Sequence, residues 1–243
     1  MRLTRVHVDA ELHSGLQLTV TGSAGNHIAR VLRLRVGDAL TLFNGQGGEY
    51  GASIEEIRRD TVVVTVLEHR EMERESPFPL VLVQGISRGE RMDWVVQKAT
   101  ELGVTRIVPI FTERSVVQLD ERQAERKVQH WLSIAIAACE QSGRNRVPQI
   151  DLPVGLYEFL EQGSAPTLAI LLSPAAALGL GDLPATAAGA CVLIGPEGGL
   201  ADVEQEAALR AGYTAVRLGP RVLRTETAAV CALTLLQQRF GDL

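Results

Sequence analysis

The sequence predicts an α/β protein that carries a small β-rich module at its N-terminus. Apolar strands alternate with helices from about residue 80 onward, whereas short alternating segments separated by glycine turns fill the first 70 residues. The length of 243 residues, 46% of them hydrophobic, is typical of one large domain or two unequal ones. We therefore expect a β-barrel-like domain at 1–70 and an α/β domain at 75–243.

The first 70 residues alternate polar and apolar side chains in short runs. Glycines and Asn44 between residues 44 and 48 predict a hairpin turn, because they tolerate positive φ. Asn26 is placed to cap a short helix at 28–34, and Gly37 with Asp38 is placed to end it. The expected strands are 16–20, 39–43, 51–54 and 61–66. The charged segment 70–77 ends in proline and predicts the domain boundary.

Beyond this boundary, short apolar runs alternate with longer amphipathic segments. Such runs are typical of strands buried on both faces of a parallel sheet. The expected strands are 80–83, 106–110, 168–172, 191–194 and 216–220. The expected helices are 92–102, 121–141, 202–211 and 227–238. We expect a mostly parallel sheet with helices on both faces.

Composition excludes several classes of function. The net charge is −5, from 24 basic and 29 acidic side chains, and only 4% of residues are aromatic, so neither bulk charge nor an aromatic platform explains nucleic-acid binding. The three cysteines and five histidines are scattered without metal-ligand spacing and indicate a reducing compartment. No apolar run is long enough to cross a bilayer. We expect no metal, no membrane contact and a cytoplasmic protein.

Two glycine-bearing loops follow late strands, where open α/β sheets collect ligands. The first, 195–199 (GPEGG), precedes a helix at Asp202 in which Gln205 is placed for a capping box. The second, 219–227, contains Arg221, Arg224 and Glu226 before a helix that Thr225 or Thr227 can cap. Tight turns without a ligand and a solvated, self-paired loop are the competing interpretations.

A third polar patch, 140–148, closes the long helix. Arg144 and Arg146 offer planar groups for a phosphate or a base edge. Compensation of the helix dipole by basic side chains is the alternative.

Four segments together resemble one known family. They are 27–38, 94–104, 138–148 and the pair 194–200 with 218–228, in which GPEGG and LGPRVLRTETA are highly specific. The chain is similar to the RsmE-type bacterial ribosomal RNA uridine N3-methyltransferases over about residues 27–238. It departs from the family pattern at 171–174 and at Ala201, where relatives place a serine cap, so we expect capping to move to Asp202.

The resemblance implies a PUA-like RNA-binding β-barrel followed by a SPOUT domain, whose mostly parallel sheet is tied in a trefoil knot. It also implies a homodimer that binds S-adenosyl-L-methionine in the knot. The implied reaction is methylation of N3 of one uridine of 16S rRNA in the small ribosomal subunit. A non-catalytic RNA-binding protein that keeps the fold is the first alternative. An α/β enzyme that uses another nucleotide cofactor is the second, but such an enzyme should have a phosphate-binding glycine motif, and this sequence has none.

Carried onto this chain, the resemblance assigns the cofactor-binding residues, whereas the catalytic and RNA-binding residues are hypotheses. A solvated helix surface is the alternative for Arg30, Arg33 and Arg35. The cofactor-binding residues are Leu172, Ser173, Ile194, Gly195, Pro196, Glu197, Gly198, Gly199, Leu218, Gly219, Leu223, Arg224, Thr225, Glu226, Thr227 and Ala228. The candidate catalytic residues are Arg144, expected to stabilise the developing uracil anion as the helix-end arginine does in relatives, Glu226 and Glu197 as bases, and Arg224, which orients one of them. A structural role, in which the carboxylate accepts backbone N–H bonds, is the alternative for both glutamates. The RNA-binding residues are Arg30, Arg33, Arg35, Arg144, Arg146 and Arg221.

Overall fold

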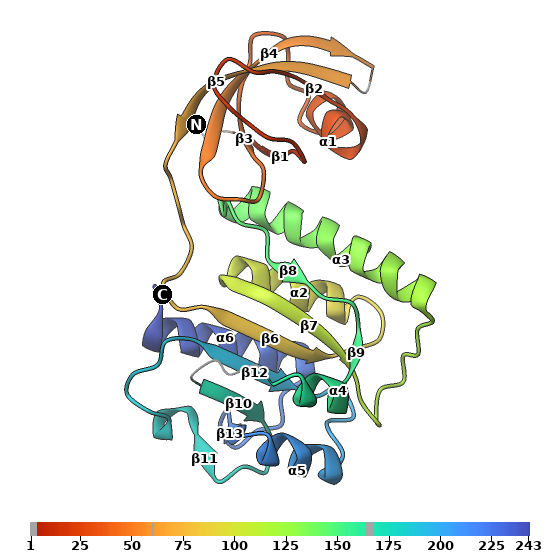
Figure 1. Cartoon of the computed structure of the whole chain (residues 1–243), viewed down its shortest axis with the longest axis vertical. Helices are drawn as coiled ribbons and strands as arrows, with labels where there is room; N and C mark the ends of the chain where they lie inside the picture. Colours follow the sequence, from red (N-terminus) through yellow and green to blue (C-terminus); the bar gives the residue numbers. More distant parts are fainter. Residues whose placement is uncertain (1–3, 60, 164–167) are drawn as a thin grey trace. The chain divides into compact units, whose positions relative to one another are not determined.

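The computed structural model describes residues 4–59, 61–163 and 168–243. They divide into two compact units, drawn in Figure 1. The first runs up to Glu75 and also contains Cys139–Val147, and the second contains Ser76–Ala138 and Pro148–Leu243. The division falls within the charged segment 70–77, but the sequence did not indicate that 139–147 belongs with the first unit.

The first unit is built on a five-stranded sheet in the order β1-β3-β4-β5-β2. All neighbours are antiparallel except β1 and β3, and residues 44–48 form the predicted connection between β3 and β4. The strands are β1 (Arg5–His7), β2 (Gln17–Val20), β3 (Ala39–Phe43), β4 (Glu49–Arg58) and β5 (Thr61–Arg70). Alternate aliphatic side chains of these strands form one buried core. Closure of this sheet into a barrel stays a prediction.

The helical segment of the first unit differs from the prediction. It consists of α1 (Gly22–Asn26) and a π-helical turn (His27–Val31). Thr21, in extended conformation, precedes the first turn, so Asn26 lies inside the helical segment and its side chain makes no capping bond. The predicted Asn26 cap is wrong because the helix begins several residues earlier than its apolar stripe indicates.

The second unit contains an eight-stranded sheet in which every pairing is parallel. Its order is β11-β13-β10-β12-β6-β7-β8, and β9 also pairs with β7. The strands are β6 (Leu80–Gly85), β7 (Val104–Phe111), β8 (Gln149–Ile150), β9 (Val154–Gly155), β10 (Leu168–Leu172), β11 (Leu178–Gly179), β12 (Ala190–Ile194) and β13 (Thr214–Arg217). The predicted parallel α/β sheet is confirmed.

Helices cover both faces of this sheet (Figure 1). They are α2 (Arg91–Glu101), α3 (Glu121–Ser142), α4 (Leu156–Glu161), α5 (Asp202–Arg210) and α6 (Thr225–Phe240), with a 3₁₀ turn at Leu180–Asp182. On one face, Cys191 and Leu193 of β12 pack against α4 and α5. Because side chains alternate along a strand, Val192 points to the other face, where α2 and α6 pack against each other.

Two predicted helix caps are wrong. The cap residue of α5 is Ala201, not Asp202, which is the first residue of the helix. Glu204, not Gln205, accepts a hydrogen bond from the Ala201 N–H at 2.7 Å. The cap residue of α6 is Arg224, and neither Thr225 nor Thr227 caps it. The Thr225 hydroxyl is used instead in a long-range bond to Gly195.

No helix within the described ranges is both long and apolar enough to span a bilayer. Nor, among the same residues, do three or more His, Cys, Asp or Glu side chains gather where they could hold a metal ion. Cys139, Cys191 and Cys231 are free thiols, and burial raises the pKa of Cys139 to about 12. Cys139 therefore stays protonated at neutral pH and is a poor nucleophile.

Two strand ends of the second unit approach each other more closely than side chains allow. A Cβ atom on Gly85, at the end of β6, would lie 2.4 Å from the Pro196 nitrogen. A Cβ atom on Gly195, after β12, would lie 2.8 Å from the backbone of Gly199 and Leu200. Glycine at both positions lets the turn 195–199 fold back against β6.

We expect Gly85→Ala to lower the free energy of unfolding of the second unit by about 2–3 kcal/mol, because the added methyl group collides with backbone. Chemical denaturation monitored by circular dichroism measures this change. Gly181→Ala is the matched control, since a Cβ atom there meets nothing within 4 Å. Equal stabilities of the two variants would contradict the close approach.

Candidate active site

A pocket of about 700 Å³ opens where β10, β12 and β13 end. Three chain segments supply most of its lining, namely 172–175, 194–200 and 216–226. Arg91, Arg114, Gln205 and Ala228 complete it. The position at the carboxyl ends of parallel strands and the volume are those of a small-molecule site.

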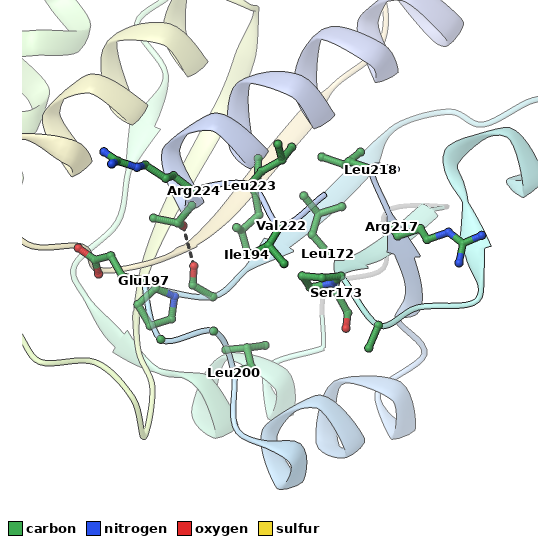
Figure 2. Close-up of a pocket in the computed structure, with 18 of the residues that line it drawn as sticks. Leu172, Ser173, Ile194, Glu197, Leu200, Arg217, Leu218, Val222, Leu223 and Arg224 are labelled. Atoms are coloured by element: carbon green, nitrogen blue, oxygen red, sulfur yellow. Dashed lines mark hydrogen bonds between the residues drawn. The ribbon is translucent and has the colours of Figure 1, made fainter. Parts of the chain in front are cut away.

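One part of the pocket lining is apolar. In Figure 2 the side chains of Leu172, Ile194, Leu218, Val222 and Leu223 gather around one space, and Leu200 lies across from them. Ser173 lies at the edge of this group, and its hydroxyl donates to Gln205 Oε1 at 3.1 Å. Aliphatic side chains beside a few fixed polar groups suit a ligand that has both an apolar ring and polar atoms.

A buried hydrogen-bond cluster fixes the segments that line the pocket. The Thr225 hydroxyl donates to the Gly195 carbonyl oxygen at 2.7 Å, and Gln84 Nε2 donates to the Thr225 hydroxyl at 2.9 Å. Thr225 and Gln84 are both buried. The cluster therefore joins the end of β6, the end of β12 and the start of α6, which are far apart in the sequence.

Two carboxylates at the pocket differ in their surroundings. Glu197 Oε1 accepts bonds from the Arg88 N–H at 3.0 Å and from Arg91 Nη1 at 2.5 Å. Partial burial raises the pKa of Glu197. The hydrogen bonds from its own N–H, from the Arg88 N–H and from Arg91, together with the charge of Arg91, lower the pKa by more, so the net shift is downward. Glu197 is therefore a fixed anion with little tendency to take up a proton.

Glu226, in the first turn of α6, is less engaged. Its Oε1 lies 4.0 Å from Arg91 Nε, while its Oε2 is buried and finds no hydrogen-bond partner in the described part of the chain. A buried carboxylate oxygen without a partner is costly unless a ligand satisfies it. Of the two carboxylates, Glu226 is the one with a buried oxygen that no described residue satisfies.

The structure brings almost all the residues predicted to bind the cofactor to this pocket. Every one of them lines it except Thr227, which lies on the exposed side of α6. Of the residues predicted to be catalytic, Glu197, Glu226 and Arg224 line it. The arginine beside the two carboxylates is Arg91, whereas the described residues include no ion-pair partner of Arg224.

Arg144 is not among the residues that line the pocket. It belongs to the first unit, is 3% exposed, and donates two hydrogen bonds to the carboxylate of Glu75, at 2.9 and 2.5 Å. Arg146, also in the first unit, pairs with Glu73 at 3.0 Å. The predicted RNA-binding residues Arg30, Arg33 and Arg35 are exposed in the same unit, and Arg221 is exposed at the pocket.

Sequence reasoning missed several lining residues, among them Arg91, Arg114, Gln205 and Arg217. Arg91 follows the end of β6, and the strand-end rule that selected 195–199 and 219–227 could have selected it too. Arg114 follows β7 in the same way, and its Nη1 donates to the Gly198 carbonyl oxygen at 3.1 Å. No sequence signal marks Gln205 as a lining residue, because its position fits an ordinary helix start.

Family models cover most of the chain. The model described as RNA methyltransferase domain matches residues 74–237, which contain the whole pocket. The model described as RNA methyltransferase PUA domain matches residues 20–67, within the five-stranded sheet.

Individual relatives agree with these models over nearly their full lengths. Ribosomal RNA small subunit methyltransferase E of Buchnera aphidicola is 34% identical over 242 residues, which is 100% of this chain and 98% of the relative. The enzyme of the same name from Bacillus subtilis is 33% identical over 90% of this chain and 88% of its own.

Solved structures give the same result. A Legionella pneumophila protein solved with its bound cofactor S-adenosylmethionine has a TM-score of 0.97 and is 42% identical, each chain being covered completely. Ribosomal RNA small subunit methyltransferase E of Neisseria gonorrhoeae, bound to S-adenosylmethionine, has a TM-score of 0.93 at 35% identity, again over 100% of both chains. The fold, the pocket and these matches together show that the chain belongs to the ribosomal RNA small subunit methyltransferase E family.

Proposed function

We propose that this protein uses S-adenosyl-L-methionine to methylate N3 of one uridine of 16S rRNA in the small ribosomal subunit. The observation that carries the proposal is the meeting of segments 172–175, 194–200 and 216–228 in one pocket, within a chain of this family. We further propose that it acts as a homodimer in the cytoplasm, that a trefoil knot encloses the pocket, and that the five-stranded sheet closes into a PUA-like barrel that binds RNA.

The pocket fits this cofactor. The apolar group around Ile194 and Leu223 would hold the adenine ring, and the backbone of 195–199 would supply hydrogen bonds close to the ligand. When bound, S-adenosylmethionine supplies a methyl group attached to a positively charged sulfur, and no metal is needed to activate it. The Glu197 carboxylate, held as an anion, lies where it can stabilise that charge.

Methylation at uracil N3 requires removal of the N3 proton. Glu226 Oε2 is the group in the pocket that is buried, acceptor-only when ionised, and not already bonded within the described residues. Arg91 fixes Glu197 and lies near Glu226 Oε1, so it positions the carboxylate pair. We therefore assign proton removal to Glu226 and electrostatic anchoring to Glu197.

Arg144 and the arginines of the first unit keep their predicted roles as parts of this proposal. For Arg144, action at the uracil requires that its two bonds to Glu75 open or rearrange. Arg30, Arg33 and Arg35 are exposed and available to rRNA phosphates without such a change.

The proposal is tested by calorimetric titration with S-adenosylmethionine and by mass mapping of small-subunit rRNA after reaction with this protein. We expect one binding site per chain and one new methyl group, at N3 of one uridine. A chain that binds rRNA but neither binds the cofactor nor methylates would be a non-catalytic RNA-binding protein.

We expect Leu223→Ala to weaken cofactor binding about five- to twentyfold, because it removes apolar contact from the proposed adenine site. Calorimetry measures the change in Kd. Leu209→Ala is the matched control, since Leu209 is 47% exposed on α5 and does not line the pocket. Equal affinity of both variants would place the adenine ring elsewhere.

We expect Glu226→Gln to keep cofactor affinity within about threefold and to slow single-turnover methyl transfer by about 10²–10⁴-fold, as loss of a general base does. Rapid-quench measurements at saturating cofactor separate binding from chemistry. If Glu226→Gln instead abolishes cofactor binding and reacts at the normal rate once saturated, Glu226 is a binding residue and not the base.

We expect Arg91→Met to raise the pKa of Glu197 toward its ordinary value, because a hydrogen bond and a positive charge are lost. A lowered carboxyl pKa stabilises the folded state above the ordinary pKa range, and this contribution disappears as the pH falls through the lowered value. The stability deficit of Arg91→Met should therefore be present at pH 7 and shrink below about pH 4.

Carbon-13 NMR titration of Glu197 and denaturation over a pH series measure these two effects. Arg210→Met is the control, since it removes an exposed ion pair with Glu206 on α5. A Glu197 titration that is identical in Arg91→Met and in the unsubstituted protein would show that Arg91 does not hold this carboxylate.

A further inference from the structure

The loop 219–224, which we name the rim loop, exposes an aliphatic side chain at the mouth of the pocket. Val222 is 80% exposed, the largest value among the exposed large hydrophobic side chains of the described residues. It also lines the pocket, next to Leu172 and Ile194 in Figure 2. A single exposed valine needs no explanation elsewhere on a surface, but this one lies at the edge of the pocket.

Two arginines flank this valine, and their guanidinium groups have no partner in the described part of the chain. Among the five arginines that line the pocket, Arg91 pairs with Glu197, Arg114 with the Gly198 carbonyl oxygen, and Arg217 with the Ala176 carbonyl oxygen. Arg221 and Arg224 are exposed, and neither guanidinium has a hydrogen-bond or ion-pair partner among the described residues. In Figure 2, Arg224 directs its guanidinium away from the apolar part of the pocket.

The backbone at the two ends of the rim loop is constrained, by a glycine turn at one end and by the hydrogen bonds of Thr225 at the other. Gly219 has a φ of +99°, which favours glycine and turns the chain sharply after β13. At the other end, Thr225 is fixed by its bonds with Gly195 and Gln84. A loop with fixed ends presents its exposed side chains in a defined direction, which lowers the entropy cost of using them in binding.

We infer that the rim loop docks the RNA strand at the target nucleotide, with Arg221 and Arg224 binding its phosphates and Val222 packing against the bases beside the nucleotide that enters the pocket. This inference rests on the proposed function. Guanidinium groups bind phosphates through two parallel hydrogen bonds, and aliphatic side chains inserted at a base step stabilise an unstacked nucleotide. A uridine must leave its stack before N3 can reach the pocket.

Charge complementarity favours RNA as the occupant. The chain as a whole carries a net charge of −5, yet its two unpartnered pocket arginines lie on this one loop. A polyanion satisfies both of them, and the valine between them fits the apolar face of a base. A second copy of the chain, which carries the same net negative charge, is the other occupant that the experiment must distinguish.

The test uses the full-length protein with small ribosomal subunits that lack the methyl group. Arg221→Gln, Arg224→Gln and Val222→Ser are compared with controls away from the pocket, Arg122→Gln on α3 and Val116→Ser, whose valine is 59% exposed. Each variant is assayed for cofactor Kd, for subunit Kd over a salt series, for kcat/KM and for its oligomeric state by sedimentation.

We expect each arginine variant to reduce the slope of log Kd against log salt concentration by about 0.7, the value for one lost phosphate contact to a single strand. We expect Val222→Ser to lower kcat/KM for the subunit, measured at saturating cofactor, at least about tenfold, and Val222→Ile to restore most of the rate. The control variants should match the unsubstituted protein in every assay.

Unchanged salt slopes in both arginine variants, or a Val222→Ser enzyme with normal kcat/KM, would overturn the inference. Loss of self-association in the rim-loop variants would also overturn it and assign the loop to a second copy of the chain. If the unsubstituted protein neither binds S-adenosylmethionine nor methylates the subunit, the proposed function itself fails, and this outcome is distinct from the others.

Discussion

The hydrogen bond from the Thr225 hydroxyl to the Gly195 carbonyl oxygen is the interaction on which the rest of the site depends. It joins the first residue of α6 to the first residue after β12, two points 30 positions apart in the chain. Gln84 extends the link to β6, and Gly85 has no side chain, so Pro196 can lie against the strand. The sheet already brings the ends of β12 and β13 to one edge through β10, and this link fixes the turn 195–199 against the start of α6.

The pocket separates two kinds of surroundings that its proposed reaction requires. Leucine, isoleucine and valine side chains surround the space for an apolar ring. Charged groups lie at its edge, where Arg91 fixes Glu197 and leaves one oxygen of Glu226 without a partner. Glu197 is held as an anion by Arg91 and the Arg88 N–H, whereas Glu226 Oε2 is left for a ligand to satisfy.

The secondary structure of the second unit could largely be predicted from the sequence. The runs 168–172 and 191–194 are wholly apolar, as expected for strands buried on both faces, and they became β10 and β12 with at most one residue of difference. The helix caps could not be predicted. The Thr225 hydroxyl donates to the Gly195 carbonyl oxygen instead of capping α6, and at the start of α5 it is Glu204, not Gln205, that accepts the hydrogen bond from the Ala201 N–H. A capping pattern is local, whereas these choices depend on tertiary contacts.

The site could be predicted only where its residues belong to local sequence motifs. The segments around Gly198 and Thr225 carry distinctive motifs, and both line the pocket. Arg91 carries no such motif, and its partner Glu197 is 106 positions away, so only the fold reveals the pair. Arg144 shows the opposite case, because its position at a helix end favoured an exposed role, while the structure buries it against Glu75.

Hydrogen exchange measured by mass spectrometry with and without S-adenosylmethionine tests the central claim most directly. If the ends of β10, β12 and β13 form one cofactor pocket, the ligand will slow exchange in 172–175, 194–200 and 216–228 together and leave residues 5–59 unchanged. Slower exchange in only one of the three segments, or none in any of them at saturating ligand, would contradict the account.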